Sequence, residues 1–472
     1  MRNLTKGLLV ILLLAACCLG LSGAGAETLL NESGDTWYLS FAAEQILTDP
    51  DSEQPLYIAG YNSGWEVTDV LDYCEARAVW LDTGAQGVLL IGVDCVALDS
   101  GTVKEIRHRL ADLPDCASIN VYATHTHAGP DTLGLWGPTG VNGKNEAYMN
   151  ALVQAAETAA RKAASDRRPG TLYFGQVMTE DMYRDSRFPE VYDAALYHLR
   201  FAPQDGSAGI RLYFYGAHAE SLRGGNTRLS RDFPGLLCDS VTQQTGDRTM
   251  FFPGAIGGLI MTRAFVSDTS LMALDNLQIT ADKLISYALA IQPDQERLLA
   301  PSYALSRQIF TVPLDNPAFL LYKFLGILNN KAVPAQSRTG YAVETELSVL
   351  MLDNLALTLI PGELFPELVT GSAYGYANPE GMNPRPLRDM AQEHGIRDLL
   401  IVGLANDELG YIVPPSDFLL NEEAPYLMKT MDALGENHYE ETNSVGPDCA
   451  QAIADAFEAA VNALQAVYAP IR

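Results

Sequence analysis

Apolar runs of strand length alternate with helical segments along most of the chain, and this alternation constrains the fold more than any other feature. Aliphatic and aromatic residues dominate the runs at 88–98, 118–124, 172–177, 210–217, 343–352, 355–360 and 399–405. Their composition and length predict strands. Helices are predicted near 145–164, 268–291 and 449–466. Because strands this apolar are buried on both faces, the sequence predicts an α/β fold with mixed β-sheets covered by α-helices.

The chain following its N-terminal segment is predicted to form one domain. It contains no internal repeat, no low-complexity block and no linker rich in Pro and Ser. Of the 472 residues, 48% are hydrophobic and 19% are charged, which is typical of globular proteins and excludes a disordered or fibrous chain. We expect residues 27–472 to form a single domain of catalytic size.

Residues 1–26 are predicted to be an export signal. Arg2 and Lys6 are basic, and residues 7–26 carry no charge. The sequence AGA before Glu27 suits an ordinary signal peptidase, whereas LAAC, ending at Cys17, resembles a bacterial lipobox in which Cys17 would be lipidated. The apolar run is also long enough for an uncleaved membrane helix. We expect an exported protein, either a cell-envelope lipoprotein or a secreted protein.

The charge balance limits the partners of the protein. The formal net charge is -27, and no run of Lys and Arg is present. Nucleic acid is excluded as a partner, because its binding depends on basic side chains that neutralise phosphates. Acidic lipid head groups would be repelled. We therefore expect contact with a membrane only through an N-terminal anchor.

Two predicted strands end at histidines. The strand 118–124 continues into His125-Thr126-His127, and Gly129-Pro130 then breaks it. Residues two apart on an extended chain point to the same face, so both imidazoles can address one site. The strand 210–217 ends at His218. With 7 His in the chain, this concentration at strand ends is notable, although a hydrogen-bonded structural pair would give the same pattern.

Two further predicted strands end near a carboxylate and a phenol. Pro361-Gly362 stops the strand 355–360 and is followed by Glu363, and the loop after 399–405 leads to Tyr411. Ligands of α/β proteins bind outside the carboxyl ends of strands. Two His and one Glu form a familiar zinc ligand set with an open position. Each residue taken singly also fits a helix cap, a loop hydrogen bond or the edge of a core, so both interpretations remain.

The sequence THTHAGP at 124–130 resembles the HTHSGP signature of the neutral/alkaline, non-lysosomal ceramidases. The similarity continues in order through ARAV at 76–79, VD at 93–94, SRDFPG at 230–235, PGE at 361–363, GLAN at 403–406, GY at 410–411, YE at 439–440 and GP at 446–447. It extends from about Tyr57 to the end of the chain. The resemblance implies the N-terminal catalytic domain of a ceramidase-like enzyme.

The resemblance also implies a set of site residues. The implied zinc ligands are His125, His218, Glu363 and Tyr411. The implied catalytic residues are His127, Tyr411 and Arg187. His127 would support the attack or stabilise the tetrahedral intermediate, and Arg187, within Asp185-Ser186-Arg187-Phe188-Pro189, would contact the substrate. The implied reaction is hydrolysis of the amide bond of ceramide or a related N-acyl lipid by a water that Zn²⁺ activates.

Three differences from the family bear on the substrate. Residues 254–260 read GAIGGLI where the family has a GDVSPN-type loop with a functional serine, and Ala128 replaces the serine of the signature. Because the chain ends soon after Pro447, we expect the family's C-terminal domain to be missing. Two alternatives therefore remain open: a metallohydrolase of the same fold that acts on a different amide or ester, and a non-catalytic envelope lipoprotein.

Overall fold

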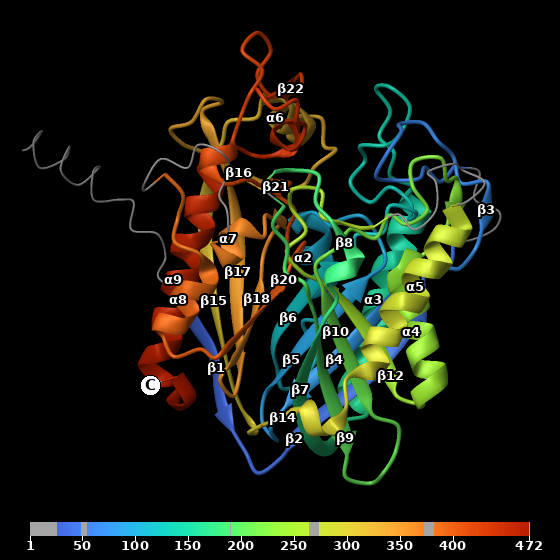
Figure 1. The fold of residues 1–472 in the computed structure, drawn as a ribbon, viewed down its shortest axis with the longest axis vertical. Helices are drawn as coiled ribbons and strands as arrows, with labels where there is room; N and C mark the ends of the chain where they lie inside the picture. The colour runs from blue at the N-terminus through green and yellow to red at the C-terminus, as the bar shows by residue number, and fades with distance from the viewer. Residues whose placement is uncertain (1–25, 49–53, 189, 264–272, 372–381, 472) are drawn as a thin grey trace, which may run out of the picture.

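A computed structural model describes residues 26–48, 54–188, 190–263, 273–371 and 382–471 (Figure 1). The predicted export signal lies almost entirely in residues 1–25, outside the described residues. Within the described ranges, no helix combines the length and the apolar character needed to cross a membrane.

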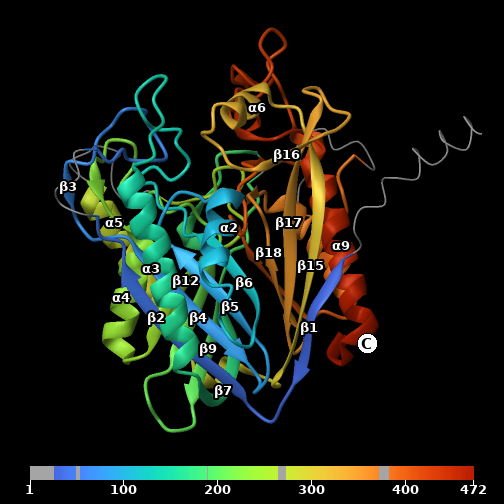
Figure 2. The same ribbon diagram turned by 180° about the vertical axis from the view of Figure 1, so that it is seen from behind.

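Two β-sheets form the centre of the molecule (Figures 1 and 2). The nine-stranded sheet has the order β12 (Arg248–Pro253), β10 (Ile210–Tyr215), β9 (Ala195–Pro203), β7 (Arg168–Met178), β2 (Trp37–Gln45), β4 (Glu75–Asp82), β5 (Gly87–Val93) and β6 (Cys116–Ala123), with β14 (Arg297–Leu299) paired to β7. The six-stranded sheet has the order β1 (Glu27–Ser33), β15 (Ser302–Leu314), β17 (Tyr341–Leu352), β18 (Leu355–Leu359) and β20 (Asp398–Val402), with β16 (Lys331–Pro334) paired to β17. Both sheets are mixed: β5–β6, β10–β12 and β18–β20 are parallel pairs, and the other pairs are antiparallel.

Short paired strands join the loops at the ends of these sheets. They are β3 (Asp69–Val70) with β11 (Arg228–Leu229), β8 (Tyr183–Arg184) with β13 (Met261–Thr262), β19 (Glu363–Leu364) with β21 (Tyr411–Ile412), and β22 (Thr430–Met431) with β23 (Asn437–His438). Single 3-10 turns occur at Glu180–Met182, Pro293–Gln295, Pro415–Asp417, Glu440–Asn443 and Ala469–Ile471.

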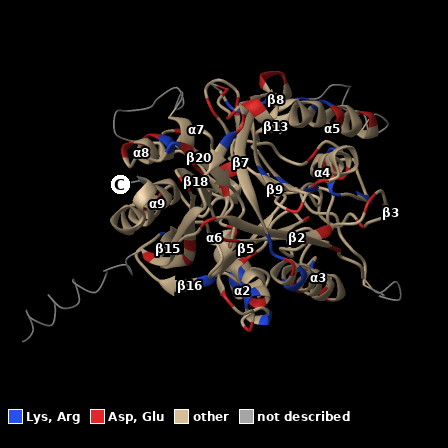
Figure 3. Ribbon diagram, turned by 90° about the horizontal axis from the view of Figure 1, so that it is seen from below, with Lys and Arg blue, Asp and Glu red and all other residues tan. Residues whose placement is uncertain are grey.

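Helices cover the outer faces of both sheets. The larger sheet packs against α2 (Ser100–Arg109), α3 (Glu146–Ser165), α4 (Asp232–Thr245) and α5 (Ala273–Ala290). The smaller sheet packs against α7 (Glu367–Thr370), α8 (Leu387–Glu393) and α9 (Cys449–Val467), and α6 (Pro317–Phe324) follows β15 at one end. Figure 3 shows acidic and basic residues together on outer helices such as α2 and α8, as expected for surfaces that face water.

Alternating side chains within the strands build the layers. In β17, Leu350 points into the core between the two sheets, and Met351 points into the core beneath α9. All residues of β5 are buried, because this strand has a packed layer on each face. The predicted architecture of mixed sheets covered by helices is thus confirmed.

The predicted elements agree with the structure apart from their ends. The predicted strand 88–98 is too long, because β5 ends at Val93. The Asp94 carboxylate then accepts hydrogen bonds from the Glu75 amide at 3.0 Å and the Thr124 hydroxyl at 3.0 Å, which stabilises a bend. The predicted helix 268–291 corresponds to α5, and its first residues, 268–272, lie outside the described residues.

The two sheets are joined where β6 and β20 end. Tyr122 pairs with Ala405 across the sheets, and the Asn406 side chain accepts a hydrogen bond from the Val121 amide at 2.9 Å. The Gly403 amide, just after β20, donates to the Pro253 carbonyl at the end of β12 at 3.0 Å. These bonds hold the strand ends together. The predicted site residues come after these strand ends in the chain.

Candidate active site

Backbone carbonyls orient the two histidines that follow β6 and β10. Nδ1 of His125 lies 2.7 Å from the Val96 carbonyl, and Nδ1 of His218 lies 2.8 Å from the Ile260 carbonyl. Since a carbonyl only accepts, each Nδ1 must carry the proton. In the neutral imidazoles, both Nε2 atoms therefore present lone pairs. This tautomer and this carbonyl support are the usual arrangement of metal-binding histidines.

His125 has an unusual backbone conformation. Its φ is 65°, in the left-handed region, which costs a non-glycine residue roughly 1–2 kcal/mol. The bond to Val96 and the bridge between Thr126 and Ala219 hold the residue in this conformation. Such strain is common at functional sites.

Glu363 and Tyr411 reach the same place through a short parallel strand pair. They are register partners of β19 and β21, so their side chains emerge side by side. A hydrogen bond from Tyr411 contributes to stabilising the charged form of the Glu363 carboxylate. Both residues are buried, at 7% and 6% exposed.

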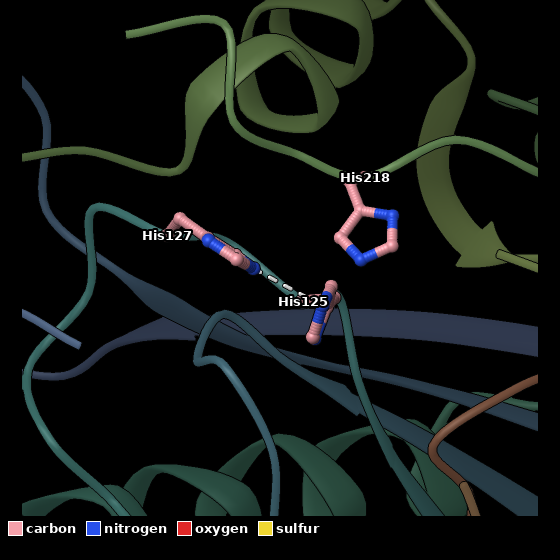
Figure 4. Close-up of side chains that lie close together, drawn as sticks. All are labelled: His125, His127 and His218. Atoms are coloured by element: carbon pink, nitrogen blue, oxygen red, sulfur yellow. Dashed lines mark hydrogen bonds between the residues drawn. The ribbon is translucent and has the colours of Figure 1, made fainter. Parts of the chain in front are cut away.

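The donor atoms of these residues lie at distances that suit one metal ion. Oε2 of Glu363 is 3.0 Å from Nε2 of His218 and 3.6 Å from Nε2 of His125. Tetrahedral zinc with bonds of about 2.0–2.1 Å separates its ligand atoms by about 3.3 Å. His125, His127 and His218 also form a group whose donor atoms lie within 4.8 Å of one another and could hold a metal ion (Figure 4).

The electrostatics of this cluster also favour a cation. Burial lowers the pKa of His125 to about 4, so its Nε2 is unprotonated at neutral pH. Burial would lower the pKa of His218 too, but the adjacent Glu363 carboxylate raises it above its usual value. Burial opposes the charge of Glu363, yet His125 and His218 hold its pKa below the usual range. A lone pair beside a carboxylate repels it unless a proton or a metal ion lies between them, so the donor set fits a bound metal.

His127 lies beside this donor set. Its Nε2 is 3.1 Å from Nε2 of His125 (Figure 4). Its ring also makes an edge contact with Tyr61. The buried Nδ1 has no hydrogen-bond partner among the described residues; the nearest carboxylate, Glu220, is 3.9 Å away. Gly60 packs against the ring so closely that a Cβ there would lie 2.5 Å from Nδ1. Gly60, Tyr61 and Glu220 therefore hold His127 in position.

The site opens into a pocket with mainly apolar walls. Its volume is about 100 Å³, and His125, His127, Glu363 and Tyr411 form one side of it. The remaining wall is mostly apolar, with Val96, Ala97, Leu133, Leu135, Trp136, Phe319, Leu328 and Tyr439, and it also includes Gly60, Gly410 and the polar residues Glu408 and Asn443. Such a pocket can take an apolar chain and place its polar end against the histidines.

Two solved structures of ceramidases are similar to this chain in fold. The crystal structure of neutral ceramidase from Pseudomonas aeruginosa superposes with a TM-score of 0.70 at 16% sequence identity, covering 92% of this chain and 75% of that chain. The chain has the neutral ceramidase fold. A ceramidase complexed with C2 gives a TM-score of 0.68 at 17% identity, covering 93% of this chain and 76% of that chain. No protein-family model and no curated protein sequence matches this chain.

Arg187 is the one predicted site residue that lies outside both the pocket lining and the cluster of donor atoms. It is 2% exposed, and its guanidinium bonds to Asp417 at 2.7 Å, Glu440 at 3.0 Å and Glu441 at 3.0 Å. The guanidinium also lies over the Phe365 ring at 5.6 Å, and that ring packs against Tyr411 at 6.5 Å. Arg187 is therefore connected to the site indirectly, through the Phe365 ring and through Glu440, which accepts a hydrogen bond from the Tyr439 amide at 3.1 Å.

The loop that differs most from the ceramidase pattern still supports a site residue. The Ile260 carbonyl accepts from both the backbone amide and Nδ1 of His218, each at 2.8 Å. The Gly257 amide donates to the Leu364 carbonyl of β19 at 2.9 Å, and a Cβ at Gly257 would lie 2.4 Å from the Phe365 ring. The loop thus fits between His218 and the strand that carries Glu363.

Sequence reasoning missed two acidic side chains near the histidines. Glu220 is 8% exposed and accepts a hydrogen bond from Tyr61, and its position two residues after His218 was an available signal. Glu408 lines the pocket; burial, reinforced by Glu363, raises its pKa well above the usual value. The acidic sequence Asp407-Glu408 precedes Tyr411, but nothing in it distinguishes the side chain that faces the pocket.

Proposed function

We propose that this protein is a zinc-dependent hydrolase of linear amides that cleaves the amide bond of ceramide or a related N-acyl lipid. The observation that carries the proposal is the convergence of the His125, His218 and Glu363 donor atoms beside an apolar pocket. The fold shared with neutral ceramidases supports the same reaction class, and the ordered sequence motifs agree with it.

In this proposal, Zn²⁺ is held by His125, His218, Glu363 and Tyr411. When bound, the ion supplies a Lewis acid for the amide carbonyl and activates a water as the nucleophile. No Ser or Cys nucleophile is then needed.

The other side chains of the pocket would bind and orient the substrate. The apolar wall would hold an acyl chain and exclude water from the site. His127, clamped by Gly60 and Tyr61, would hold or move a proton at its Nε2, beside His125. Arg187 would act as a positioning residue, since it is connected to Tyr411 through the Phe365 ring.

A different substrate for the same chemistry remains a second candidate. Glu408, together with Asn443, brings polar groups into a pocket whose wall is mostly apolar beyond the histidine side. The buried Oε2 of Glu408 has no hydrogen-bond partner among the described residues. A substrate with a hydroxyl or amino group in its acyl chain could bond to this oxygen, so the alternative is an amide or ester whose acyl part is more polar than a plain fatty acid.

A substrate panel tests the proposal. The zinc-loaded protein is incubated with detergent-dispersed N-acylsphingosine, an acyl ester of the same chain length and a short polar amide, and release of the acid is measured. We expect zinc-dependent release from the N-acyl lipid that Glu363→Gln abolishes. Preference for the polar amide would favour the second candidate, and a zinc-loaded protein inert on all three would refute hydrolase function.

We propose that the protein is located in the cell envelope or outside the cell. Residues 1–26 would direct its export, either as a lipoprotein signal that ends at Cys17 or as an ordinary signal peptide cleaved before Glu27. If Cys17 carries a lipid, Cys17→Ala should move the protein from the membrane fraction to the soluble fraction, or leave it unprocessed. Fractionation unchanged by the substitution, together with a mature N-terminus at Glu27, would contradict lipidation and support ordinary secretion.

A further inference from the structure

Large apolar side chains are exposed on two segments at one end of the molecule. We call them the apolar rim: Leu321, Phe324, Leu325, Leu427, Met428 and Met431. Phe324 is 66% exposed and Met431 is 64% exposed. Figures 1 and 2 both place α6 and β22 at the same extremity, beyond the ends of the sheets. No residue of α6 is buried, which is unusual for a helix this apolar.

The two segments of the rim are connected to each other. The Asn316 side chain, at the start of α6, donates hydrogen bonds to the Thr442 and Ser444 carbonyls at 3.0 Å. The Arg338 guanidinium lies over the Tyr426 ring at 5.8 Å, beside Leu427. These contacts hold the parts of the chain that carry the two rim segments near each other.

The rim is also continuous with the pocket. Phe319, on α6, lines the pocket two residues before Leu321. Tyr439, which follows β23, lines the pocket as well and is 40% exposed. The α6 segment and the β22–β23 hairpin thus each adjoin a residue of the pocket wall.

The two segments of the rim differ in charge. Residues 316–343 contain Lys323, Lys331 and Arg338 but no Asp or Glu, whereas residues 417–443, which include the other rim segment, are acidic and contain Lys429 as their one Lys or Arg. An exposed apolar helix with basic side chains is typical of segments that lie in the interface of a lipid bilayer. Lys323 can bond to the phosphates of neutral phospholipids, whereas Lys331 is already paired with Glu344 at 2.7 Å. The acidic remainder of the surface disfavours strongly anionic membranes.

We infer that the apolar rim docks this protein on a zwitterionic lipid surface and delivers a lipid from that surface to the pocket. This contact is separate from any N-terminal anchor. The identity of the delivered lipid rests on the proposed function. The docking on a lipid surface does not depend on that function. Residues that project from α6 and from the β22–β23 hairpin would enter the head-group region.

Vesicle binding tests the inference directly. The full-length protein and the double variant Phe324→Asp/Met431→Asp are sedimented with phosphatidylcholine vesicles, so the N-terminal segment is the same in both. Leu298→Asp is the matched control, because Leu298 is 58% exposed on β14 at the opposite end of the molecule. We expect at least about tenfold weaker vesicle binding for the double variant, since losing the burial of one large apolar side chain accounts for about that factor. The control should bind like wild type.

Activity assays separate failure of this inference from failure of the proposed function. On a detergent-dispersed substrate, the double variant should turn over like wild type, whereas on the same substrate in vesicles its rate should fall with its binding. Equal vesicle binding by wild type and the double variant would overturn the inference, whatever the activity. Loss of folding is excluded by an unchanged melting temperature. The rim could instead be the interface of a dimer. In that case the mass of wild type would increase with concentration, the double variant would stay a monomer, and wild type would not bind vesicles. That result would also overturn the inference.

Discussion

The metal site makes the sharpest prediction, and His218→Ala tests it. His218 is fully buried, contributes one lone pair and is the nearest neighbour of the Glu363 carboxylate at 3.0 Å. Removing its side chain leaves His125, Glu363 and Tyr411. Zinc sites with four protein ligands have apparent binding free energies of about 10–16 kcal/mol, so an equal share is about 3 kcal/mol per ligand. The variant should therefore bind zinc on the order of 100-fold more weakly.

Zinc competition measures this loss. Wild type and variant are stripped of metal, titrated with zinc against a chromogenic chelator, and analysed for bound zinc after gel filtration. His394→Ala is the matched control, because His394 lies at the end of α8 and bonds to Gln465 at 2.9 Å, away from the cluster. We expect about one zinc per chain in wild type and in the control, and substoichiometric zinc in His218→Ala.

Two measurements, the zinc affinity and the thermal unfolding of the variant, decide whether His218 is a zinc ligand. A variant that keeps full zinc occupancy with an unchanged Kd would refute the assignment of His218 as a ligand. A variant that loses zinc because it unfolds would lose its cooperative melting transition as well, so thermal unfolding of the metal-free proteins is measured in parallel. Zinc should also raise the melting temperature of wild type and of the control more than that of the variant, because a ligand that binds only the folded state stabilises it.

Three further substitutions test the surroundings of the site. His127→Ala should keep zinc and the fold but lower turnover about 10²- to 10³-fold, by analogy with the removal of an oxyanion-hole donor; loss of zinc would make His127 a ligand, and near-normal turnover would leave it a structural role. Gly60→Ala should give a smaller loss of turnover with zinc retained, since φ is 104° and the new Cβ must displace the His127 ring; wild-type kinetics would show that the ring position does not matter. Arg187→Met should lower the free energy of unfolding by about 3–5 kcal/mol, because it leaves Glu440 and Glu441 buried without their cation. Denaturant unfolding measures this change, and a wild-type stability combined with a raised KM would instead support direct substrate contact.

The strands and the strand-end site residues were predictable because their signals are local. An apolar run long enough for a strand and a Gly-Pro break are visible in the sequence, so the ends of β6 and β18 were found close to their observed positions. The spacing of His125 and His127 also predicted that both would address one place, and their Nε2 atoms lie 3.1 Å apart. What spacing could not give was the convergence of residues about 90 to 240 positions apart, which depends on how the two sheets pack.

Burial and pairing of charges were not predictable from local patterns. A short sequence match predicts that Arg187 contacts the substrate, which stays a prediction, but the match does not indicate that the guanidinium is surrounded by carboxylates from residues 417–441. Those carboxylates follow β21, far along the chain from Arg187, and no periodicity marks them. Glu408 was overlooked for the same reason, since its exposure to the pocket depends on the turn between β20 and β21.

The altered loop at 254–260 shows why side-chain identity is an incomplete guide to this site. Its sequence lacks the Asp, Ser and Pro of the ceramidase pattern, which by itself favours a lost or changed activity. Yet the contact that orients His218 is made by the Ile260 backbone carbonyl, and any residue supplies that group. The loop must instead pass between β19 and the strand end that carries His218, where a Cβ at Gly257 would lie 2.7 Å from the Glu363 carbonyl. Glycine at position 257 allows the loop to pack closely against the strand that carries Glu363. The loop therefore lacks the polar side chains of the ceramidase pattern but keeps the proposed zinc ligands in place. The changed chemistry should consequently appear in the choice of substrate rather than in metal binding.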